Sequence, residues 1–325
     1  MSQLDPREEI FRIPSGVGDL QVFLRYLGPD GGAHAARADN VVLYVHGGTF
    51  PSALSIAHRF DGRSWRDELC AAGFHVWGQD FHGFGATSDP YPEMSQPAEG
   101  RPPLGRTAEA SVQLESAVRF ILERHGVERL SLVAHSWGSL VTGHFTARCP
   151  DLVRRIVLFG PIARREPAGG RVRLPAWRPV SLQDQWDRFT SEVPAGEAPV
   201  LSRRLFDVWG EAYLDCEPAS RERTPPAVKV PGGAFQDIYD AWAGEFPYDP
   251  ARIKAPVAII RGEWDAMCAD ADAKWLFDGF RNAPIRRDVK ISRATHLMHL
   301  ESGRFALYRE TEAFLKGGDV ASDTD

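Results

Sequence analysis

The chain has 325 residues, of which 43% are hydrophobic and 25% are charged, and its formal net charge at pH 7 is −6. This length and composition are typical of a globular protein of one large or two ordinary domains, and they exclude a wholly disordered chain. The negative charge and the lack of a Lys/Arg-rich run disfavour nucleic-acid binding.

Residues 1–9 are polar and acidic, whereas a secretory signal begins basic and continues apolar. No apolar run approaches the roughly 20 residues that span a bilayer. The cysteines, Cys70, Cys149, Cys216 and Cys268, lie far apart without a CxxC pair, which predicts reduced thiols and neither a disulfide framework nor a zinc site. We therefore expect a soluble cytoplasmic protein, monomeric or homodimeric, whose partner is a small-molecule substrate and not a membrane.

Strand-like and helix-like stretches alternate over the first half of the chain. Residues 16–19 separate two short segments whose partial alternation predicts a β-hairpin. Apolar runs suited to strands buried on both faces of a parallel sheet then follow at 41–45, 74–80, 130–133 and 156–159. Helical spacing of apolar residues lies between these runs, at 61–72, 112–122 and 140–147. The order predicts a doubly wound parallel sheet, with the proline-rich residues 90–103 as a long surface excursion.

The pattern changes after the fourth of these runs. Proline, glycine and aromatic residues recur among charges without a strand-like run, so we expect residues 164–246 to form a helical cap. This cap would be inserted into a core made of residues 1–163 and 247–325. Regular alternation returns beyond the cap, with strands predicted at 256–260 and 289–292 and a terminal helix.

Ser136 lies between a predicted strand and a predicted helix, in the pattern small-x-Ser-x-Gly made with Ala134 and Gly138. Such an abrupt turn strains the serine backbone, so we expect a positive φ and a need for small neighbours. A serine hydroxyl is a poor nucleophile at neutral pH and needs a base in contact and a third group that orients the base. Asp265 and His296 supply these groups, and all three residues follow predicted strands, where ligands collect in open parallel sheets.

The base and the acid each have rivals in the sequence. His299 competes with His296, but it falls in the helix that follows the last strand. Glu263 and Asp270 compete with Asp265, which lies at the turn directly after the strand at 256–260. We therefore predict His296 as the base and Asp265 as the group that orients it.

An acyl-transfer site also needs hydrogen-bond donors for the oxyanion of the tetrahedral intermediate. The sequence predicts the backbone N–H of Trp137 as one donor and an N–H of the loop after the strand at 41–45 as the other, from Gly48 or, as the second choice, Thr49. Three nearby histidines are predicted to be structural: His46, His82 and His135.

The order of serine, acid and histidine resembles that of the α/β-hydrolase fold family, although most members carry glycine where Ala134 stands. The resemblance extends from about Val41 to Phe314, and His46-Gly47-Gly48 is similar to the family's oxyanion loop. Residues 80–88 resemble its Asp-x-Arg-Gly-x-Gly-x-Ser loop, with His82 in place of arginine and one extra residue before Ser88. The resemblance implies a mostly parallel sheet of about eight strands with helices on both faces, an inserted cap and serine chemistry that needs no metal or other cofactor.

We consider side chains of the cap and of the oxyanion loop as candidate substrate contacts. Aromatic residues would either pack in a core or line an apolar pocket, and those considered are Phe50, Trp177, Trp186 and Trp209. Arginines at the entry of the cap form either a solvated surface or an anion site, and these are Arg164 and Arg165, followed by Arg171, Arg173 and Arg178.

The sequence thus predicts hydrolysis of a carboxylic ester through an acyl-enzyme on Ser136. The ester would carry an apolar or aromatic group, and also an anionic group if the cap arginines form an anion site. Two alternatives stay open. Proline iminopeptidases are similar in their Ser-Trp-Gly elbow and His-Gly-Gly loop, and they bind a free amine with cap carboxylates, here Glu192, Glu211, Glu217 or Glu245. A non-enzymatic ligand receptor built on a hydrolase pocket is the second alternative.

Overall fold

The computed structural model describes residues 4–31, 35–60, 62–167, 169–170 and 172–317. Its centre is an eight-stranded sheet in the spatial order β1-β2-β4-β3-β5-β6-β9-β10. Neighbouring strands run parallel from β4 to β10, while β1 and β2 join this part antiparallel at one edge. The strands are β1 (Glu9–Pro14), β2 (Gln21–Leu27), β3 (Val41–Val45), β4 (His75–Asp80), β5 (Leu130–His135), β6 (Val153–Phe159), β9 (Val257–Gly262) and β10 (Arg286–Ile291).

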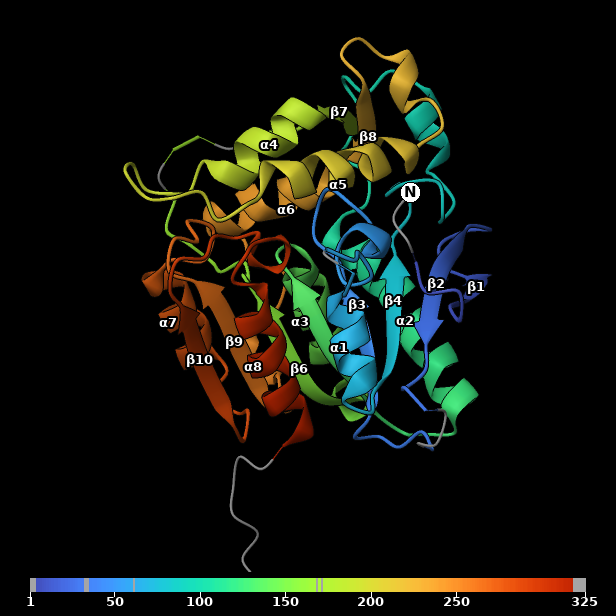
Figure 1. Cartoon of the computed structure of the whole chain (residues 1–325), viewed down its shortest axis with the longest axis vertical. Helices are drawn as coiled ribbons and strands as arrows, with labels where there is room; N and C mark the ends of the chain where they lie inside the picture. The colour runs from blue at the N-terminus through green and yellow to red at the C-terminus, as the bar shows by residue number, and fades with distance from the viewer. Residues whose placement is uncertain (1–3, 32–34, 61, 168, 171, 318–325) are drawn as a thin grey trace, which may run out of the picture.

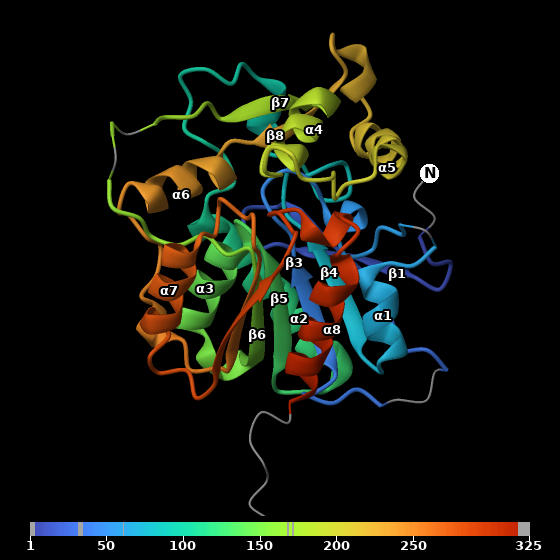
Figure 2. The ribbon, with the colours of Figure 1, turned by 60° about the vertical axis from the view of Figure 1, so that its left-hand side comes forward.

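Helices cover both faces of this sheet (Figures 1 and 2). On one face lie α1 (Trp65–Ala71) and α8 (Arg304–Lys316), and on the other lie α2 (Thr107–His125), α3 (Gly138–Arg148) and α7 (Asp270–Gly279). Successive residues of a strand point to opposite faces, so Leu43 belongs to the core under α2 and α3 whereas Tyr44 belongs to the core under α1 and α8. This explains why β3 is apolar at every position and why β5, β6 and β9 are mostly apolar. The predicted fold class is confirmed.

Short-range sequence signals account for some element boundaries better than for others. Helix α1 begins after Ser64 because Ser64 and Asp67 form a capping box, with N–O distances of 3.1 and 2.9 Å. We predicted that this helix begins at Asp61, which lies outside the described residues. Helix α7 was not predicted, because its buried face offers only Asp272, Ala273 and Leu276. Strand β10 begins three residues before the predicted start.

An inserted segment, residues 164–246, lies above the carboxyl ends of the strands in both views (Figures 1 and 2). It contains β7 (Trp177–Ser181), α4 (Leu182–Thr190), α5 (Arg203–Asp215), β8 (Ala227–Pro231) and α6 (Gly233–Trp242). The helices agree with the prediction, but the expectation of no strand was wrong, because β7 and β8 pair antiparallel. Each of these strands has five residues and includes a proline, Pro179 or Pro231, which weakens a strand signal.

Residues 90–103 lie largely at the surface, as the sequence predicted, but they also contact the inserted segment. Their backbone pairs with the inserted segment: Ala176 N donates to Ala98 O at 3.0 Å, and Leu104 N donates to Ala176 O at 3.1 Å. Lys229 Nζ adds a bond of 2.8 Å to Met94 O. The covering layer over the sheet edge is therefore built from two separate parts of the chain.

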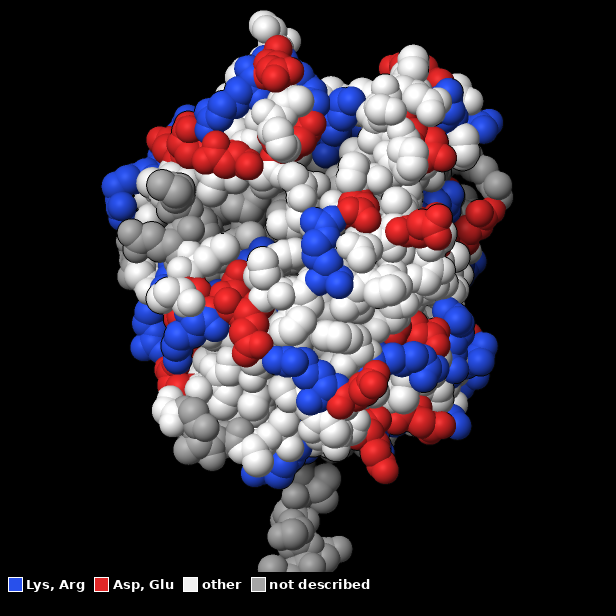
Figure 3. Space-filling model, turned by 90° about the vertical axis from the view of Figure 1, so that its right-hand side faces the viewer, with Lys and Arg blue, Asp and Glu red and all other residues white. Residues whose placement is uncertain are grey.

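Short 3-10 helices connect many of these elements. They are η1 (Ser52–Leu54), η2 (Pro92–Ser95), η3 (Pro150–Leu152), η4 (Ser220–Glu222), η5 (Pro250–Arg252) and η6 (Met298–Leu300). On the face shown in Figure 3, Lys and Arg side chains are interspersed with Asp and Glu side chains around uncharged areas. Within the described residues, no helix combines the length and the apolar composition that crossing a membrane requires.

Candidate active site

Ser136 occupies the turn between β5 and α3. Its φ is +54°, in the left-handed region as predicted, and its backbone N–H donates to Phe159 O at 3.0 Å, which holds the turn against β6. A Cβ at Gly138 would lie 2.6 Å from the backbone oxygen of His46, so only glycine lets α3 start this close to β3. The neighbouring strands thus impose the strained backbone that presents the serine hydroxyl at the sheet edge.

His296 follows β10 and contacts both Ser136 and Asp265. Its Nε2 lies 2.8 Å from Ser136 Oγ, and its Nδ1 lies 3.0 and 3.1 Å from the two carboxylate oxygens of Asp265. This pattern assigns the proton to Nδ1, which donates to Asp265, and leaves Nε2 to accept from the serine hydroxyl. The exposed fractions of Ser136, Asp265 and His296 are 5%, 3% and 1%. Burial by itself lowers the pKa of His296, but the Asp265 carboxylate outweighs burial and raises this pKa above its ordinary value.

Asp265 is held by its own loop after β9. One carboxylate oxygen accepts backbone N–H bonds from Met267 and Cys268, each at 2.9 Å. The two rival carboxylates have other partners: Glu263 accepts from Arg293 N, and the exposed Asp270 pairs with Arg261 and Lys290. The structure therefore brings Asp265, and neither rival, to His296.

Gly160, at the end of β6, lies directly against the Asp265–His296 pair. It has a φ of +52°, and a Cβ there would lie 2.9 Å from both Asp265 Oδ2 and His296 Nδ1. Any side chain would therefore collide with the two hydrogen-bonded groups, whatever the backbone strain. The sequence showed only that no carboxylate stands at this position; the structure adds that the position must be nearly empty.

The loop after β3 passes beside the serine. A Cβ on Gly47 would lie 3.2 Å from Cβ of Ser136. Within the described part of the chain, the backbone N–H groups of Gly48, Thr49 and Trp137 donate no hydrogen bond. These amides are the predicted oxyanion donors, and they belong to the loop after β3 and to the turn that carries Ser136.

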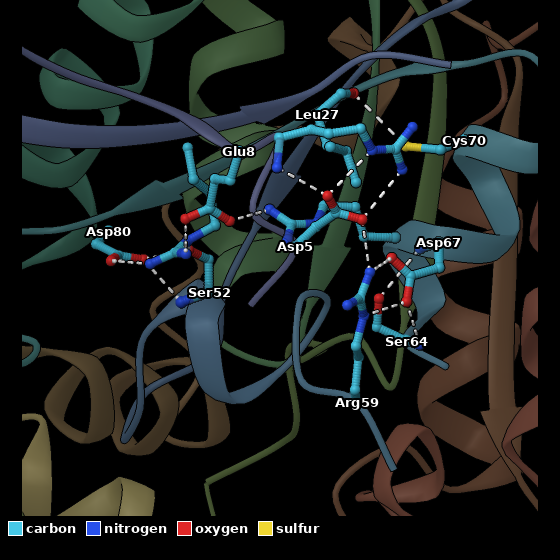
Figure 4. Close-up of polar contacts among 12 residues, drawn as sticks. Asp5, Glu8, Leu27, Ser52, Arg59, Ser64, Asp67, Cys70 and Asp80 are labelled. Atoms are coloured by element: carbon cyan, nitrogen blue, oxygen red, sulfur yellow. Dashed lines mark hydrogen bonds and ion pairs between the residues drawn. The ribbon is translucent and has the colours of Figure 1, made fainter. Parts of the chain in front are cut away.

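A buried carboxylate, Asp80, fixes the far end of this loop. Ser52 N donates to Asp80 Oδ1 at 2.7 Å, and Thr87 Oγ1 donates to Asp80 Oδ2 at 2.7 Å. Arg25 donates to Ser52 Oγ at 2.8 Å and to Glu8 at 2.8 Å, and so extends the network toward the N-terminus (Figure 4). The position of the loop at 46–52 is therefore determined by buried charges and not by the loop's own sequence alone.

The histidines that the sequence assigned to structural roles have structural contacts. His46 accepts from Phe81 N at 3.1 Å and its other ring nitrogen lies 2.6 Å from Gly47 O, while His82 contacts Asp89 O at 3.0 Å. His135 lies 3.1 Å from the backbone oxygen of His296. His299, the rival base, has no hydrogen-bond partner on either ring nitrogen in the described structure and stacks on Phe50, and burial holds its pKa well below the ordinary value.

Comparison with known proteins decides the family. A family model described as "alpha/beta hydrolase fold" matches residues 40–303, which is more than half of the chain. The chain belongs to the α/β-hydrolase fold family. It is an enzyme of the α/β-hydrolase type, and the resemblance in the sequence is confirmed.

Individual relatives of this α/β-hydrolase are distant. A homoserine O-acetyltransferase of Deinococcus radiodurans is 24% identical over 277 residues, which cover 79% of this chain and 70% of that protein. A thermophilic esterase from Thermogutta terrifontis superposes with a TM-score of 0.58 at 16% identity, covering 95% of this chain and 98% of the other. A serine hydrolase from Cycloclasticus zankles has a TM-score of 0.57 at 18% identity, with 98% and 100% covered. These structural similarities show the shared fold.

The aromatic residues predicted to contact substrate separate into two groups in this α/β-hydrolase. Phe50 lies in the oxyanion loop and packs on the fully buried Trp209 of α5, with ring centroids 5.3 Å apart. Trp186 packs on Phe206 within the inserted segment, and Trp177 donates to Gln96 O on the proline-rich stretch. The structure brings Phe50 and Trp209 to the loop beside Ser136 and gives Trp177 and Trp186 partners elsewhere.

The two arginines predicted as an anion site also have partners of their own. Arg165 forms two bonds to Asp272, at 2.9 and 2.6 Å, and donates to the backbone oxygens of Ala266 and Met267. Arg164 donates to Gly244 O at 2.9 Å and pairs with Glu166. Arg165 thus contacts the loop that carries Asp265, and both arginines have partners within the protein. Arg171 lies outside the described residues.

Three residues of the inserted segment contact the site in ways that the sequence did not predict, although Glu192 was named there as a possible amine-binding carboxylate. Asp237 accepts from Trp137 Nε1 at 2.9 Å. Glu192 accepts from the backbone N–H groups of Ala266 and His296, at 3.0 and 2.7 Å, and burial raises its pKa. Arg188 donates to Thr49 Oγ1 at 2.6 Å. No pattern in the sequence marks these three, because their roles depend on how α4 and α6 rest on the sheet edge.

Metal binding has no visible basis in this α/β-hydrolase. Among the residues that the structure describes, no group of three or more His, Cys, Asp or Glu side chains is placed to hold a metal ion. The cysteines Cys70, Cys149, Cys216 and Cys268 are free thiols.

Proposed function

We propose that the protein is a serine hydrolase that cleaves a carboxylic ester through an acyl-enzyme on Ser136. The observation that carries the proposal is the hydrogen-bonded series Ser136 Oγ, His296 and Asp265, with a serine–imidazole distance of 2.8 Å. A serine in contact with an oriented, buried imidazole is the arrangement that nucleophilic catalysis requires. The free amides at Gly48, Thr49 and Trp137 support it.

The reaction follows from these groups in two halves. Ser136 Oγ attacks the ester carbonyl carbon while its proton passes to His296 Nε2, and the amides of Trp137 and Gly48 stabilise the oxyanion. His296 then returns the proton to the leaving alcohol, which leaves the acyl group on Ser136. Water attacks the acyl-enzyme in the same way and releases the carboxylic acid. Asp265 keeps the proton of His296 on Nδ1 and stabilises the imidazolium that forms in each half.

The inserted segment, residues 164–246, acts in this proposal as the cap that limits access to Ser136. Its position above the strand ends supports this role (Figures 1 and 2). Phe50, Phe189 and Trp209 surround one another beside the oxyanion loop, with centroid distances of 5.2 to 5.9 Å. The apolar part of the substrate would pack against these rings.

Acyl transfer is a second candidate function, favoured by the similarity to a homoserine O-acetyltransferase. An alcohol in place of water would take the acyl group from Ser136 through the same proton transfers. Product analysis with a 4-nitrophenyl ester in the presence of added alcohols, homoserine among them, tests this. Formation of the new ester faster than of the free acid supports transfer, whereas release of the acid alone supports hydrolysis.

No contact favours an aminopeptidase. Glu192 binds two backbone amides, Glu211 pairs with Arg221, and Glu217 pairs with Arg223, so these carboxylates already have donors. A ligand receptor is tested by turnover: many product molecules released per protein molecule exclude it, and tight binding without turnover supports it.

The decisive experiment compares Ser136→Ala with Ser131→Ala on a panel of esters, thioesters, lactones and arylamides. Ser131 is a matched control because it lies in β5, is buried and makes no hydrogen bond through its hydroxyl in the described structure. We expect Ser136→Ala to lower kcat about 10⁴-fold or more and to lose labelling by a fluorophosphonate, while Ser131→Ala retains both. An unchanged rate in Ser136→Ala would overturn the proposal.

A further inference from the structure

Arg188 is a cation from α4 placed beside the oxyanion loop. Its Nη2 donates to Thr49 Oγ1 at 2.6 Å and to Gln185 Oε1 at 2.7 Å. Thr49 belongs to the loop after β3, and Gly47 of the same loop lies against Ser136, so the guanidinium contacts the loop that passes beside the serine. Its positive charge also lowers the pKa of His296, which places it within electrostatic range of the base.

This guanidinium has no carboxylate partner. Among the described residues, no ion pair includes Arg188, and its Nε is buried without a hydrogen-bond partner. Arginines elsewhere in the inserted segment are paired, as Arg165 is with Asp272 and Arg223 with Glu217. Burial lowers the pKa of Arg188 to about 10, and the positive charge of Arg178 acts in the same direction. The protein therefore leaves an enclosed cation with an unused donor, an arrangement that is costly unless a further partner binds.

Arg188 lies against an aromatic ring, and the other groups near it are His299 and Glu192. Its guanidinium lies 5.0 Å from the ring centroid of Phe189, which packs on Phe50 and Trp209. The nearby His299 is held neutral by burial, and the positive charge of Arg188 contributes to this. Glu192, the carboxylate whose charge acts on Arg188, already accepts the N–H groups of Ala266 and His296. An anionic group that enters this space would find Arg188 as its partner.

We propose that Arg188 binds a carboxylate of the substrate, so that the enzyme selects esters that carry a free carboxylate near the ester bond. The inference rests on the proposed function, because it places this carboxylate relative to Ser136. It assigns to Arg188 the role that the sequence had assigned to Arg164 and Arg165. Guanidinium suits this role because its planar donors match the two oxygens of a carboxylate.

A purely structural role is the competing explanation, since Arg188 also links α4 to Thr49. The two explanations differ in what the loss of the cation does to different substrates. A structural loss lowers activity on charged and neutral esters by the same factor. Loss of a substrate contact lowers activity on the charged ester more, so the readout is the ratio of the two kcat/KM values.

The first substrate pair places the carboxylate in the acyl group: mono-(4-nitrophenyl) adipate against 4-nitrophenyl hexanoate, which have equal chain lengths. The second pair places it in the leaving group: 3-acetoxybenzoate against phenyl acetate. We expect the acid-to-neutral ratio of kcat/KM to fall about 10- to 100-fold in Arg188→Met for one of the two pairs, and Arg188→Lys to restore part of it. The pair that responds tells which half of the ester carries the carboxylate.

Arg203→Met is the matched control, because Arg203 lies on α5, is exposed and pairs with Asp207. It should leave both ratios unchanged. Ratios in Arg188→Met equal to those of the wild type for both pairs would overturn the proposal. A fall of the same size in Arg203→Met would also overturn it, since the effect would then be one of surface charge.

A binding measurement separates this inference from the proposed function. Adipate and benzoate are added to the Ser136→Ala protein, and the Tm is followed with and without Arg188→Met. Stabilisation that depends on Arg188 supports the anion site even if Ser136 proves not to be the nucleophile. Stabilisation that is the same in both proteins counts against the anion site and leaves the role of Ser136 untouched.

Discussion

The carboxyl edge of the sheet and the inserted segment above it contribute to one site by different means. At the sheet edge, Ser136 and His296 directly follow strands or their turns, and their positions are fixed by parallel neighbours. The inserted segment reaches the site through single side chains, chiefly Asp237, Arg188 and Glu192. In the proposed function, catalytic geometry is therefore a property of the sheet, whereas substrate choice depends on a small number of contacts between two layers.

Because of this difference, we expect substitutions at the sheet edge and in the inserted segment to change different properties of the protein. A change at the edge should remove catalysis while the fold survives, because the surrounding strands are held by their own cores. A change at a contact between the layers should loosen the inserted segment and lower stability. The following variants test this contrast.

The largest effect is expected for Asp265→Asn, which removes the charge beside His296. We expect kcat to fall about 10⁴-fold, because the imidazole loses its orienting acceptor. Asp265 raises the pKa of His296, and the neutral imidazole is the active form, so wild-type activity is lost as pH falls through a value above 6.5. The acid limb of kcat/KM should move to lower pH in the variant. Glu263→Gln is the control, and a pH profile identical to that of the wild type in Asp265→Asn would contradict the assignment.

A smaller but still large loss is expected for Gly160→Ala. The added Cβ would lie 2.9 Å from both Asp265 Oδ2 and His296 Nδ1 and would push the pair apart. We expect kcat to fall about 100-fold at nearly unchanged KM. Gly126→Ala is the matched control: its φ of +63° brings the same backbone strain, but no atom lies within 4 Å of the new Cβ. Equal losses of activity in the two variants would show that strain, and not the collision, is responsible.

Between the layers, Asp237→Asn should lower stability more than activity. Asp237 is buried and accepts from Trp137 Nε1, from Thr107 N at 2.6 Å and from Thr107 Oγ1 at 2.7 Å, and it pairs with Arg106. We expect the free energy of unfolding, measured with urea, to fall by about 2 to 4 kcal/mol. Asp240→Asn, which removes the more exposed partner of Arg106, should cost about 1 kcal/mol or less. A larger loss of unfolding free energy in Asp240→Asn than in Asp237→Asn would show that Asp237 does not make the main contact between the layers.

The smallest effect is expected for Glu301→Gln and concerns pH. Glu301 is buried beneath the turn that carries His296 and accepts from Thr295 N at 3.2 Å; burial raises its pKa from 4.5 to about 7. The folded state therefore holds the proton more tightly than the unfolded state, so this group's stabilising contribution is complete below pH 4.5 and is lost as pH rises to about 7. The test is the free energy of unfolding at pH 5 and at pH 7.5. Between these two values, the wild type should lose on the order of 1 to 2 kcal/mol more than Glu301→Gln does. The same pH dependence of the unfolding free energy in the wild type and in Glu301→Gln would contradict this role of Glu301.

The sequence predicted the sheet edge better than the layer above it, for a physical reason. A strand buried on both faces needs apolar residues throughout, and a strained turn needs glycine or small residues, so β5 and Ser136 are marked locally. By contrast, β7 and β8 are short and contain proline, and α7 has a weakly apolar face. The residue pattern of these segments therefore does not distinguish a strand or helix from an irregular loop.

The contacts of individual side chains were the least predictable part of the candidate site. Arg164 and Arg165 are adjacent in the sequence and stood out as a possible anion site, yet both have partners within the protein. Arg188 lies alone among mixed charges on α4, and only its position beside Thr49 distinguishes it. Sequence shows which cations exist, but the partners that neutralise them are brought together by folding.

Glu192 ties the movement of the inserted segment to the order of the site. Its two oxygens are the acceptors for the N–H groups of Ala266 and His296, which belong to the loops of the acid and the base. If α4 lifts away to admit a substrate, both amides lose their acceptor, at a cost of about 1 to 3 kcal/mol each until water replaces it. In the proposed function, an opened inserted segment and a Glu192 that holds both loops are therefore mutually exclusive.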